Sequence, residues 1–282
     1  MRALLFRLLR FLLVNFVGRR RTERLMLRMA QAVGTDLLTA AYHGMGILKY
    51  EDSRVSGEHY LVHEWLGRHV KSARPVLFDV GANTGEYAAE LKRRFPGAAV
   101  YAFEPNVNAY EVMLRELAPL GVSCYNLGLS STAAPRKMYT YEHEAASQHA
   151  SVYREVLTGL HGAAAVTELE VRTTTLDDFC AQQRVEFIDF LKIDTEGHEW
   201  EVLGGAKRMV AEGRVHLIQF EFNEMNVIAR VFLRDFYGFL EGYSFYRLDT
   251  EGLIPLGGYN STNEIFKFQN LLAVNDRIEA AR

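Results

Sequence analysis

The chain has 282 residues, of which 49% are hydrophobic and 24% charged, and its net charge is −3. This composition allows one substantial core with additions and excludes a low-complexity or disulfide-rich protein. Two cysteines, Cys124 and Cys180, are typical of free thiols in a reducing cytosol, so we expect a cytoplasmic protein.

The charge is divided unevenly along the chain. Residues 1–28 hold eight arginines and one glutamate, a net charge of +7, so the total of −3 leaves −10 on the remainder. Binding to nucleic acid depends on neutralising phosphates with basic side chains. The acidic body therefore argues against a nucleic-acid partner.

Residues 1–55 form a basic and apolar N-terminal helical segment ahead of a main domain at 56–282. Arg7 and Arg10 interrupt the apolar start, so no charge-free run approaches the ~20 residues of a bilayer span. The segment fits a helix on an anionic membrane surface, with peripheral contact through residues 1–24 at the inner face of the cell membrane. The alternative is a helix that packs on the body or on another subunit.

A helix is expected over residues 56–70, with Ser56 as its cap. His59 and His63 are four residues apart and share one face, which is the spacing of a metal-binding pair. No third ligand is obvious nearby in the sequence. We therefore favour two ordinary surface histidines.

The stretch FDVGANTGEY at residues 78–87 follows an apolar run and precedes an amphipathic one, as in the first strand–loop–helix of a nucleotide-binding α/β sheet. Gly81 and Gly85 permit a tight turn and close approach of a ligand. The loop, with Asn83, lacks the middle glycine of the dinucleotide fingerprint, and Asp79 would repel a pyrophosphate but attract an amino group. These features favour S-adenosylmethionine over NAD.

A second strand over residues 98–103 ends at Glu104, close to the ~20-residue offset at which an acid meets ribose hydroxyls. A carboxylate accepts hydrogen bonds from both hydroxyls of a vicinal diol. A helix over 107–117 and a third strand over 122–127 follow.

Five motifs together resemble the FkbM family of S-adenosylmethionine-dependent methyltransferases: FDVGANTG at 78–85, FEP at 103–105, NLGLS at 126–130, TLDDF at 175–179 and FLKIDTEGHE at 190–199. The resemblance implies a class I methyltransferase fold, which is a Rossmann-like α/β sheet, mostly parallel, with an antiparallel last strand. It implies S-adenosyl-L-methionine as cofactor and a hydroxyl of a sugar, glycan or similar polyhydroxylated acceptor as substrate. The expected cofactor-binding residues are Asp79, Gly81, Asn83, Gly85, Glu104 and Asn126.

Residues 131–167 depart from the alternation of strands and helices. A short strand is expected over 137–142, and the polar stretch after it carries His143, His149 and His161. Long connections are commonly functional, which suggests an acceptor-side insertion. A variable surface excursion is the alternative.

An apolar strand over 185–193 should place Asp194, Glu196 and His198 at its carboxyl end, where ligands bind in open α/β sheets. His198 is the candidate general base, oriented by Asp194 or Glu196, because imidazole titrates near working pH. Alternatively His198 caps or packs against the helix expected over 199–211. A fifth strand over 216–222 brings Glu221 and Asn223 to the acceptor.

The oxygens of Asp194, Glu196 and Glu221 also suit a hard divalent cation that would lower the pKa of the acceptor hydroxyl. They suit hydrogen bonds to a polyol equally well, and we predict no metal. A helix over 230–240 and strands over 244–248 and 265–273 complete the sheet as an antiparallel pair.

Other functions remain open at this stage. They are N- or O-methylation of another small molecule or lipid, oxidoreduction with a nicotinamide, and a non-catalytic, membrane-associated binding protein of the same fold. The N-P-P-Y tetrad suited to a flat amino group is missing.

Overall fold

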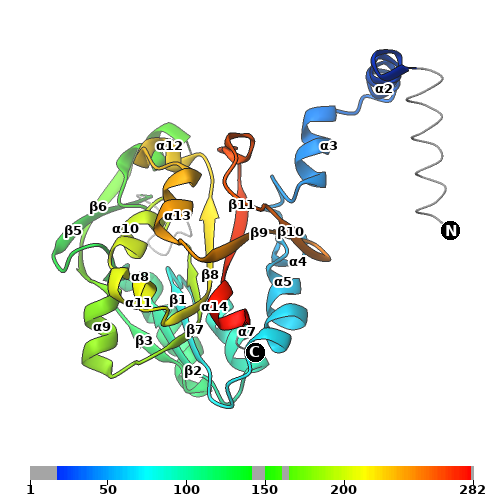
Figure 1. Cartoon of the computed structure of the whole chain (residues 1–282). Helices are drawn as coiled ribbons and strands as arrows, with labels where there is room; N and C mark the ends of the chain where they lie inside the picture. The colour runs from blue at the N-terminus through cyan, green and yellow to red at the C-terminus, as the bar shows by residue number, and fades with distance from the viewer. Residues whose placement is uncertain (1–17, 142–149, 161–164, 281–282) are drawn as a thin grey trace.

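The computed structural model describes residues 18–141, 150–160 and 165–280 (Figure 1). Most of the apolar leader, with Arg7 and Arg10, and the three histidines at 143, 149 and 161 lie outside the described residues.

Within these residues the main sheet has eight strands in the order β10-β9-β11-β8-β7-β1-β2-β3. Strands β3, β2, β1, β7 and β8 run parallel, and β11 lies antiparallel between β8 and β9. This is the predicted class I methyltransferase arrangement. The bounds are β1 Val76–Val80, β2 Ala99–Phe103, β3 Ser123–Tyr125, β7 Ile188–Ile193, β8 Val215–Phe222, β9 Tyr243–Asp249, β10 Gly252–Pro255 and β11 Gln269–Asn275.

Helices cover both faces of the sheet (Figure 1), so the central strands are buried on both sides. Every residue of β7 is buried, which explains why its sequence is apolar apart from Asp189 and Lys192. On one face Phe179 and Phe236 pack in a cluster, and on the other Leu91 and Met113 do so. The helices of the first face are α9 Leu176–Gln183, α10 Glu199–Gly204, α11 Lys207–Ala211 and α13 Leu233–Phe239; those of the second are α7 Glu86–Arg94, α8 Val107–Leu117 and the helical stretch over residues 58–69.

The helix predicted over 199–211 is divided into α10 and α11. A Cβ at Gly205 would lie 2.1 Å from the carbonyl oxygen of Ser130, so the chain needs glycine where it passes this backbone. Two further helices, α12 Met225–Ala229 and α14 Asp276–Ala280, were not predicted as separate elements. The 3₁₀ turns are η3 Ala118–Leu120 and η5 Ser261–Asn263.

A second sheet, of three strands within the described residues in the order β4-β6-β5, overlaps the region predicted as an insertion at 131–167 and extends beyond it on both sides. Strands β5 and β6 pair antiparallel, and β4 joins β6 in parallel. The bounds are β4 Gly128–Leu129, β5 Pro135–Tyr141 and β6 Val166–Thr174, with the π-helical turn η4 Val156–Leu160 between β5 and β6.

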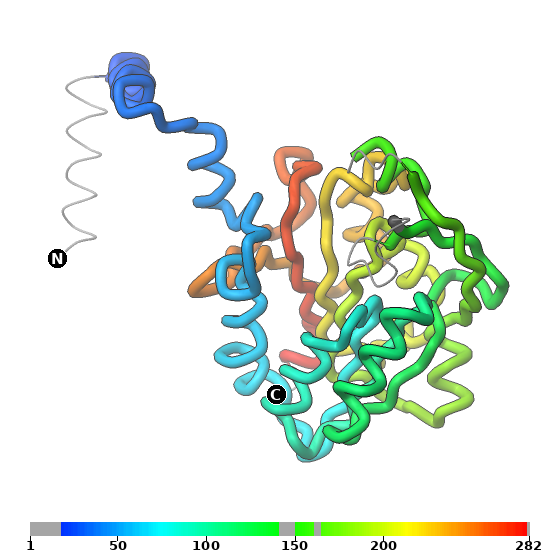
Figure 2. Tube along the Cα trace, turned by 180° about the vertical axis from the view of Figure 1, so that it is seen from behind, coloured from blue at the N-terminus to red at the C-terminus, as the bar shows by residue number. Residues whose placement is uncertain are grey.

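The N-terminal segment forms separate helices. Both views show α2 (Arg19–Ala32) and α3 (Leu37–Gly44) extending away from the sheet (Figures 1 and 2). A short α4 (Ser53–Ser56) then leads into a continuous helical stretch, α5 Glu58–Tyr60, the π-helical η2 Leu61–Trp65 and α6 Leu66–His69. Ser56 ends α4 and does not cap this stretch, which follows Gly57 at a φ of 88°. No helix among the described residues has the length and apolar character that a membrane crossing requires.

Candidate active site

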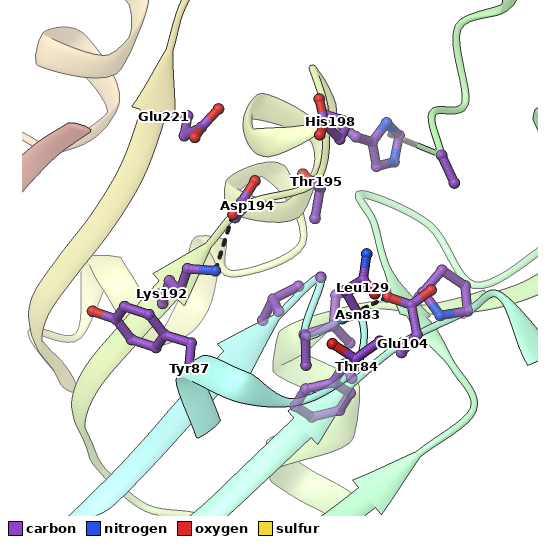
Figure 3. Close-up of a pocket in the computed structure, with 18 of the residues that line it drawn as sticks. Asn83, Thr84, Tyr87, Glu104, Leu129, Lys192, Asp194, Thr195, His198 and Glu221 are labelled. Atoms are coloured by element: carbon purple, nitrogen blue, oxygen red, sulfur yellow. Dashed lines mark hydrogen bonds and ion pairs between the residues drawn. The ribbon is translucent and has the colours of Figure 1, made fainter. Parts of the chain in front are cut away.

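A cavity of about 420 Å³ opens at the carboxyl ends of β1, β2, β7 and β8 (Figure 3). This is the edge at which open α/β sheets bind ligands. Of the predicted site residues, seven line the cavity: Gly81, Asn83, Glu104, Asp194, Glu196, His198 and Glu221. The other four, Asp79, Gly85, Asn126 and Asn223, are not part of its lining.

The two glycines of the loop also allow close contact with other parts of the protein, in addition to the approach of a ligand that we expected. A Cβ at Gly81 would lie 1.7 Å from the carbonyl oxygen of Asp194, so the loop crosses directly over the end of β7. Gly85 precedes α7 with a φ of 90°, and its Cβ would lie 2.8 Å from Leu117. Both positions therefore serve close packing at positive φ.

Glu104 lies at the end of β2 with 5% of its surface exposed. Its Oε2 accepts a hydrogen bond from the backbone N–H of Asn83 at 2.9 Å, and its Oε1 accepts one from that of Asn106 at 2.7 Å. Each carboxylate oxygen retains a lone pair for a ligand hydroxyl. Burial raises the pKa of Glu104 to about 7, against the lowering effect of these two hydrogen bonds.

Asn126 supports the Glu104 carboxylate indirectly, by bonding to the backbone that carries it. Its side-chain Nδ2 donates to the carbonyl oxygens of Glu104 and Pro105, both at 3.0 Å. The amide therefore holds the backbone that carries Glu104, instead of facing the cavity.

Lys192, which we did not predict, lies between two of the expected acids. Its Nζ is 3.0 Å from Asp194 Oδ2 and 3.6 Å from Asp79 Oδ1, and it stands over the Tyr87 ring at 4.7 Å. Burial lowers the pKa of Lys192, but the carboxylates of Asp194, Asp79 and Glu58 outweigh it and raise the pKa above its usual value. The sequence signal was a lysine within the otherwise apolar residues 190–193, directly before Asp194.

The cavity lining is strongly acidic. In the described part of the chain its carboxylates outnumber its one lysine, Lys192. Such a site attracts a cation, and the sulfonium and amino groups of S-adenosylmethionine are cationic. The lining thus fits the expected cofactor. The carboxylates belong to Glu58, Glu86, Glu90, Glu104, Asp194, Glu196 and Glu221.

His198 lies at the cavity with 6% of its surface exposed. Its Nε2 is 3.0 Å from Ser130 Oγ, and its Nδ1 has no hydrogen-bond partner among the described residues. Neither Asp194 nor Glu196 orients the ring, contrary to our expectation. Burial first, and then the positive charge of Arg136, lower the pKa of His198 to about 4.

The alternative expectation, that His198 caps or packs against the helix that follows it, is only partly confirmed. It occupies the N-cap position of α10, but its side chain makes no capping hydrogen bond. With its pKa lowered to about 4, the imidazole is neutral near pH 7, and its buried Nδ1 makes no hydrogen bond within the described residues.

Glu199 organises the loop that presents these groups, and the sequence did not single it out. Its Oε1 accepts hydrogen bonds from the N–H of Thr195 at 2.9 Å, the Thr195 hydroxyl at 3.1 Å and the N–H of Gly197 at 3.1 Å. Burial raises the pKa of Glu199 to about 7.

Glu221 lies on the far side of the cavity from Glu104 (Figure 3), and Asn223, two residues further along the chain, lies outside the lining. Asn223 Nδ2 donates to Glu221 Oε2 at 3.0 Å, so Asn223 positions the carboxylate that reaches the cavity. Burial first, and then Asp194 and Glu196, raise the pKa of Glu221 well above its usual value.

Asp194, Glu196 and Glu221, whose oxygens could suit a divalent cation, do not form a compact metal-binding group. Among the residues that the structure describes, the three-ligand cluster with atoms within 4.8 Å of one another is His59, His63 and Glu90. Asp194, Glu196 and Glu221 are not such a cluster.

Comparison with known proteins gives consistent matches. The sequence model described as "Methyltransferase FkbM domain" matches residues 79–245. Methyltransferase sdnD of Sordaria araneosa is 30% identical over 160 residues, which is 47% of this chain and 61% of that protein. The chain thus spans about 60% of the length of this relative.

Two further relatives carry more specific names. The 2-O-methyltransferase NoeI of Sinorhizobium fredii is 21% identical over 58% of this chain and 70% of its own length. The hexuronic acid methyltransferase AglP of Haloferax volcanii is 29% identical over 46% of this chain and 49% of its own length. The crystal structure of Methyltransferase FkbM from Methylobacillus flagellatus aligns with a TM-score of 0.47 at 14% identity, over 76% of this chain and 47% of that one.

Proposed function

This chain belongs to the FkbM family of S-adenosylmethionine-dependent methyltransferases, and we propose that it methylates a hydroxyl of a sugar, glycan or similar polyhydroxylated acceptor. The observation that carries the proposal is the row of carboxylates, Asp194, Glu196 and Glu221, that lines the same cavity as the neutral His198. Carboxylates are acceptors for the several hydroxyls of a polyol. The names of NoeI and AglP support the same substrate class.

The donor half of the site is built around Glu104 and the glycine loop. S-adenosylmethionine supplies a methyl group on a positively charged sulfur. Glu104 has acceptor capacity for both ribose hydroxyls, and Asn83 holds it in place through its backbone N–H. The carboxylates around Lys192 attract the cationic amino group of the cofactor. Asp79 contributes indirectly, because it pairs with Lys192, which in turn pairs with Asp194.

The acceptor half of the site requires removal of a hydroxyl proton. His198 Nδ1 is the acceptor of that proton, and the Ser130 hydroxyl at 3.0 Å from Nε2 fixes the ring. Holding the acceptor oxygen in line with the donor methyl group increases the reaction rate further.

The second sheet supplies the remaining wall of the acceptor half. Met138 on β5, Val171 and Thr173 on β6, and Ala150 and Val152 beside them all line the cavity. Met138, Ala150 and Val152 belong to residues 131–167, which we retain as a proposed acceptor-side insertion in a methyltransferase domain at 56–282, whereas Val171 and Thr173 follow this range.

The test is incubation of the full chain with isotope-labelled methyl donor and a glycan or lipid extract, followed by mass spectrometry of the labelled products. We expect the label as an O-methyl ether on a sugar or polyol. Label on an amine or on a lipid without sugar would support the other methyltransferase functions. Failure of millimolar S-adenosylhomocysteine to raise the melting temperature would support a non-catalytic binding protein.

We further propose that residues 1–24 make a peripheral contact with the inner face of the cell membrane. The neighbouring helix α2 supports this, since Leu25, Met26 and Met29 are each about half exposed and arginines flank them. Co-sedimentation with anionic vesicles should be lost when residues 1–24 are deleted. Binding that survives the deletion would refute the contact.

A further inference from the structure

A second group of side chains lies at the rim of the cavity and takes no part in the proposed reaction. His59 on α5, His63 on η2 and Glu90 on α7 bring one ligand atom each within 4.8 Å of one another. We propose that these three residues bind a divalent transition-metal ion, and that zinc is the metal their donor atoms favour. Two imidazoles and one carboxylate form one of the ligand sets that proteins use for zinc.

The third ligand comes from a distant part of the sequence. His59 and His63 are four residues apart, whereas Glu90 lies 27 residues beyond His63, on the helix that follows the glycine loop. Packing of η2 against α7 brings it to the two histidines. This is why the sequence indicated a pair without a third partner.

The distances are close to those of a metal centre. His59 Nδ1 is 3.5 Å from Glu90 Oε1, and His63 Nε2 is 2.5 Å from the same oxygen. Two ligand atoms bound at about 2.1 Å to a tetrahedral ion lie roughly 3.4 Å apart. The first pair already has this separation, and the second reaches it if the metal replaces the proton between its two atoms and the atoms separate by about 1 Å.

The side chains have the freedom and the charge environment for this change. The side chain of His63 is 35% exposed and that of Glu90 25% exposed, so small rotations do not disturb the core. Glu86 lies one turn before Glu90 on α7 and also lines the cavity, and its carboxylate adds to the attraction for a cation. His63 also lies in the π-helical segment Leu61–Trp65, a local irregularity that is frequent at functional sites.

Three protein ligands leave one position of a tetrahedral ion open. A water or an oxygen of a bound molecule can complete the coordination, and Glu90 is the ligand that also lines the cavity. The ion would also join the helical stretch after Gly57 to α7.

The experiment uses the full chain without a histidine tag, treated with a chelator and then dialysed. Isothermal titration with zinc chloride should show one saturable site per chain, and cobalt(II) should give visible absorption bands of tetrahedral intensity. His59→Gln and Glu90→Gln should each weaken zinc binding at least tenfold. Neither donor nor acceptor is present, so the result is independent of the proposed methyl transfer.

Matched controls come from exposed residues outside the cluster. His43→Gln on α3 and Glu64→Gln on η2 remove an imidazole and a carboxylate of the same kinds and should leave zinc affinity unchanged. The proposal is overturned if the parent chain has no saturable site. It is equally overturned if His59→Gln and Glu90→Gln, folded by circular dichroism, retain the parent affinity, in which case the cluster is only a hydrogen-bonded contact.

Discussion

Lys192 and Asp79 are paired neighbours on the parallel strands β7 and β1, and their side chains form an ion pair of 3.6 Å beneath the cavity. The Asp79 side chain is fully buried, and that of Lys192 is 7% exposed. A charge in this position is tolerated only when it is compensated. The aspartate at the head of the glycine loop thus acts on the site through the lysine.

Replacing Lys192 with Met should destabilise the fold by about 3–5 kcal/mol, because it leaves Asp79 charged and buried without a partner. The double variant Lys192→Met with Asp79→Asn should recover a large part of this loss, since residue 79 then carries no charge that needs compensation. Urea unfolding monitored by circular dichroism measures both values.

The matched control is Lys137→Met, which removes a lysine from an exposed pair with Glu168. Pairs of this kind contribute at most about 1 kcal/mol. A loss in Lys192→Met no greater than in Lys137→Met would contradict the role given to the buried pair.

Glu104→Gln should weaken binding of S-adenosylhomocysteine by about 10- to 100-fold. A hydrogen bond to a charged acceptor contributes about 1.5–3 kcal/mol, and the amide replaces one acceptor oxygen by a donor. Isothermal titration measures the affinity. Glu116→Gln, on the exposed side of α8, should bind as the parent does. Equal affinity in Glu104→Gln would remove this residue from the cofactor site.

The parallel half of the main sheet could be predicted from sequence because each strand is a short apolar run that ends at a turn or a polar site residue. The run before Asp194 is the clearest case. Of the second sheet the sequence predicted one strand, over 137–142, which the structure has as β5. Its pairing with β6 could not be predicted, because most residues of β6 are exposed or half buried and its partners follow from pairing across a long connection. Contacts between distant segments, such as His198 with Ser130, are likewise absent from any local pattern.

The cavity residues divide in the same way, into those with a local sequence signal and those without one. The sequence identified Glu104, Asp194 and His198 because acids and histidines after strands carry a local signal. It also predicted Asn126 to bind the cofactor and Asn223 to bind the acceptor. In the structure the Asn126 side chain bonds to backbone carbonyls and that of Asn223 to the Glu221 carboxylate. Glu199 was missed because its effect depends on the loop that folds back onto it.

Glu199 should make the protein less stable as the pH rises. Its pKa is raised from 4.5 to about 7 by burial, so between these values the native state binds a proton that the unfolded state has lost. Stability is therefore fully retained below about pH 4.5 and falls toward pH 7, by about 3 kcal/mol from this group.

Glu199→Gln should flatten the decline, because the amide oxygen can still accept from Thr195 and Gly197 without ionising. Glu104 contributes a decline of the same sign, so part of the slope remains. Urea unfolding from pH 4.5 to 8 gives the profile, with Glu116→Gln as control. A slope in Glu199→Gln identical to that of the parent would contradict the raised pKa.

His198→Ala should lower kcat by about 10²- to 10⁴-fold, the usual contribution of a general base, while changing S-adenosylmethionine affinity little. Ser130→Ala should lower kcat less, because it loosens the ring without removing it. Since the pKa of His198 is lowered to about 4, the neutral imidazole predominates throughout pH 5–8, and kcat should show no fall with a midpoint near 6.5. Initial rates at saturating donor and acceptor test both points, with His43→Ala as an exposed control. Full turnover in His198→Ala would assign proton removal to another group, and a midpoint near 6.5 that His198→Ala abolishes would show an imidazole far more accessible to water than the one described.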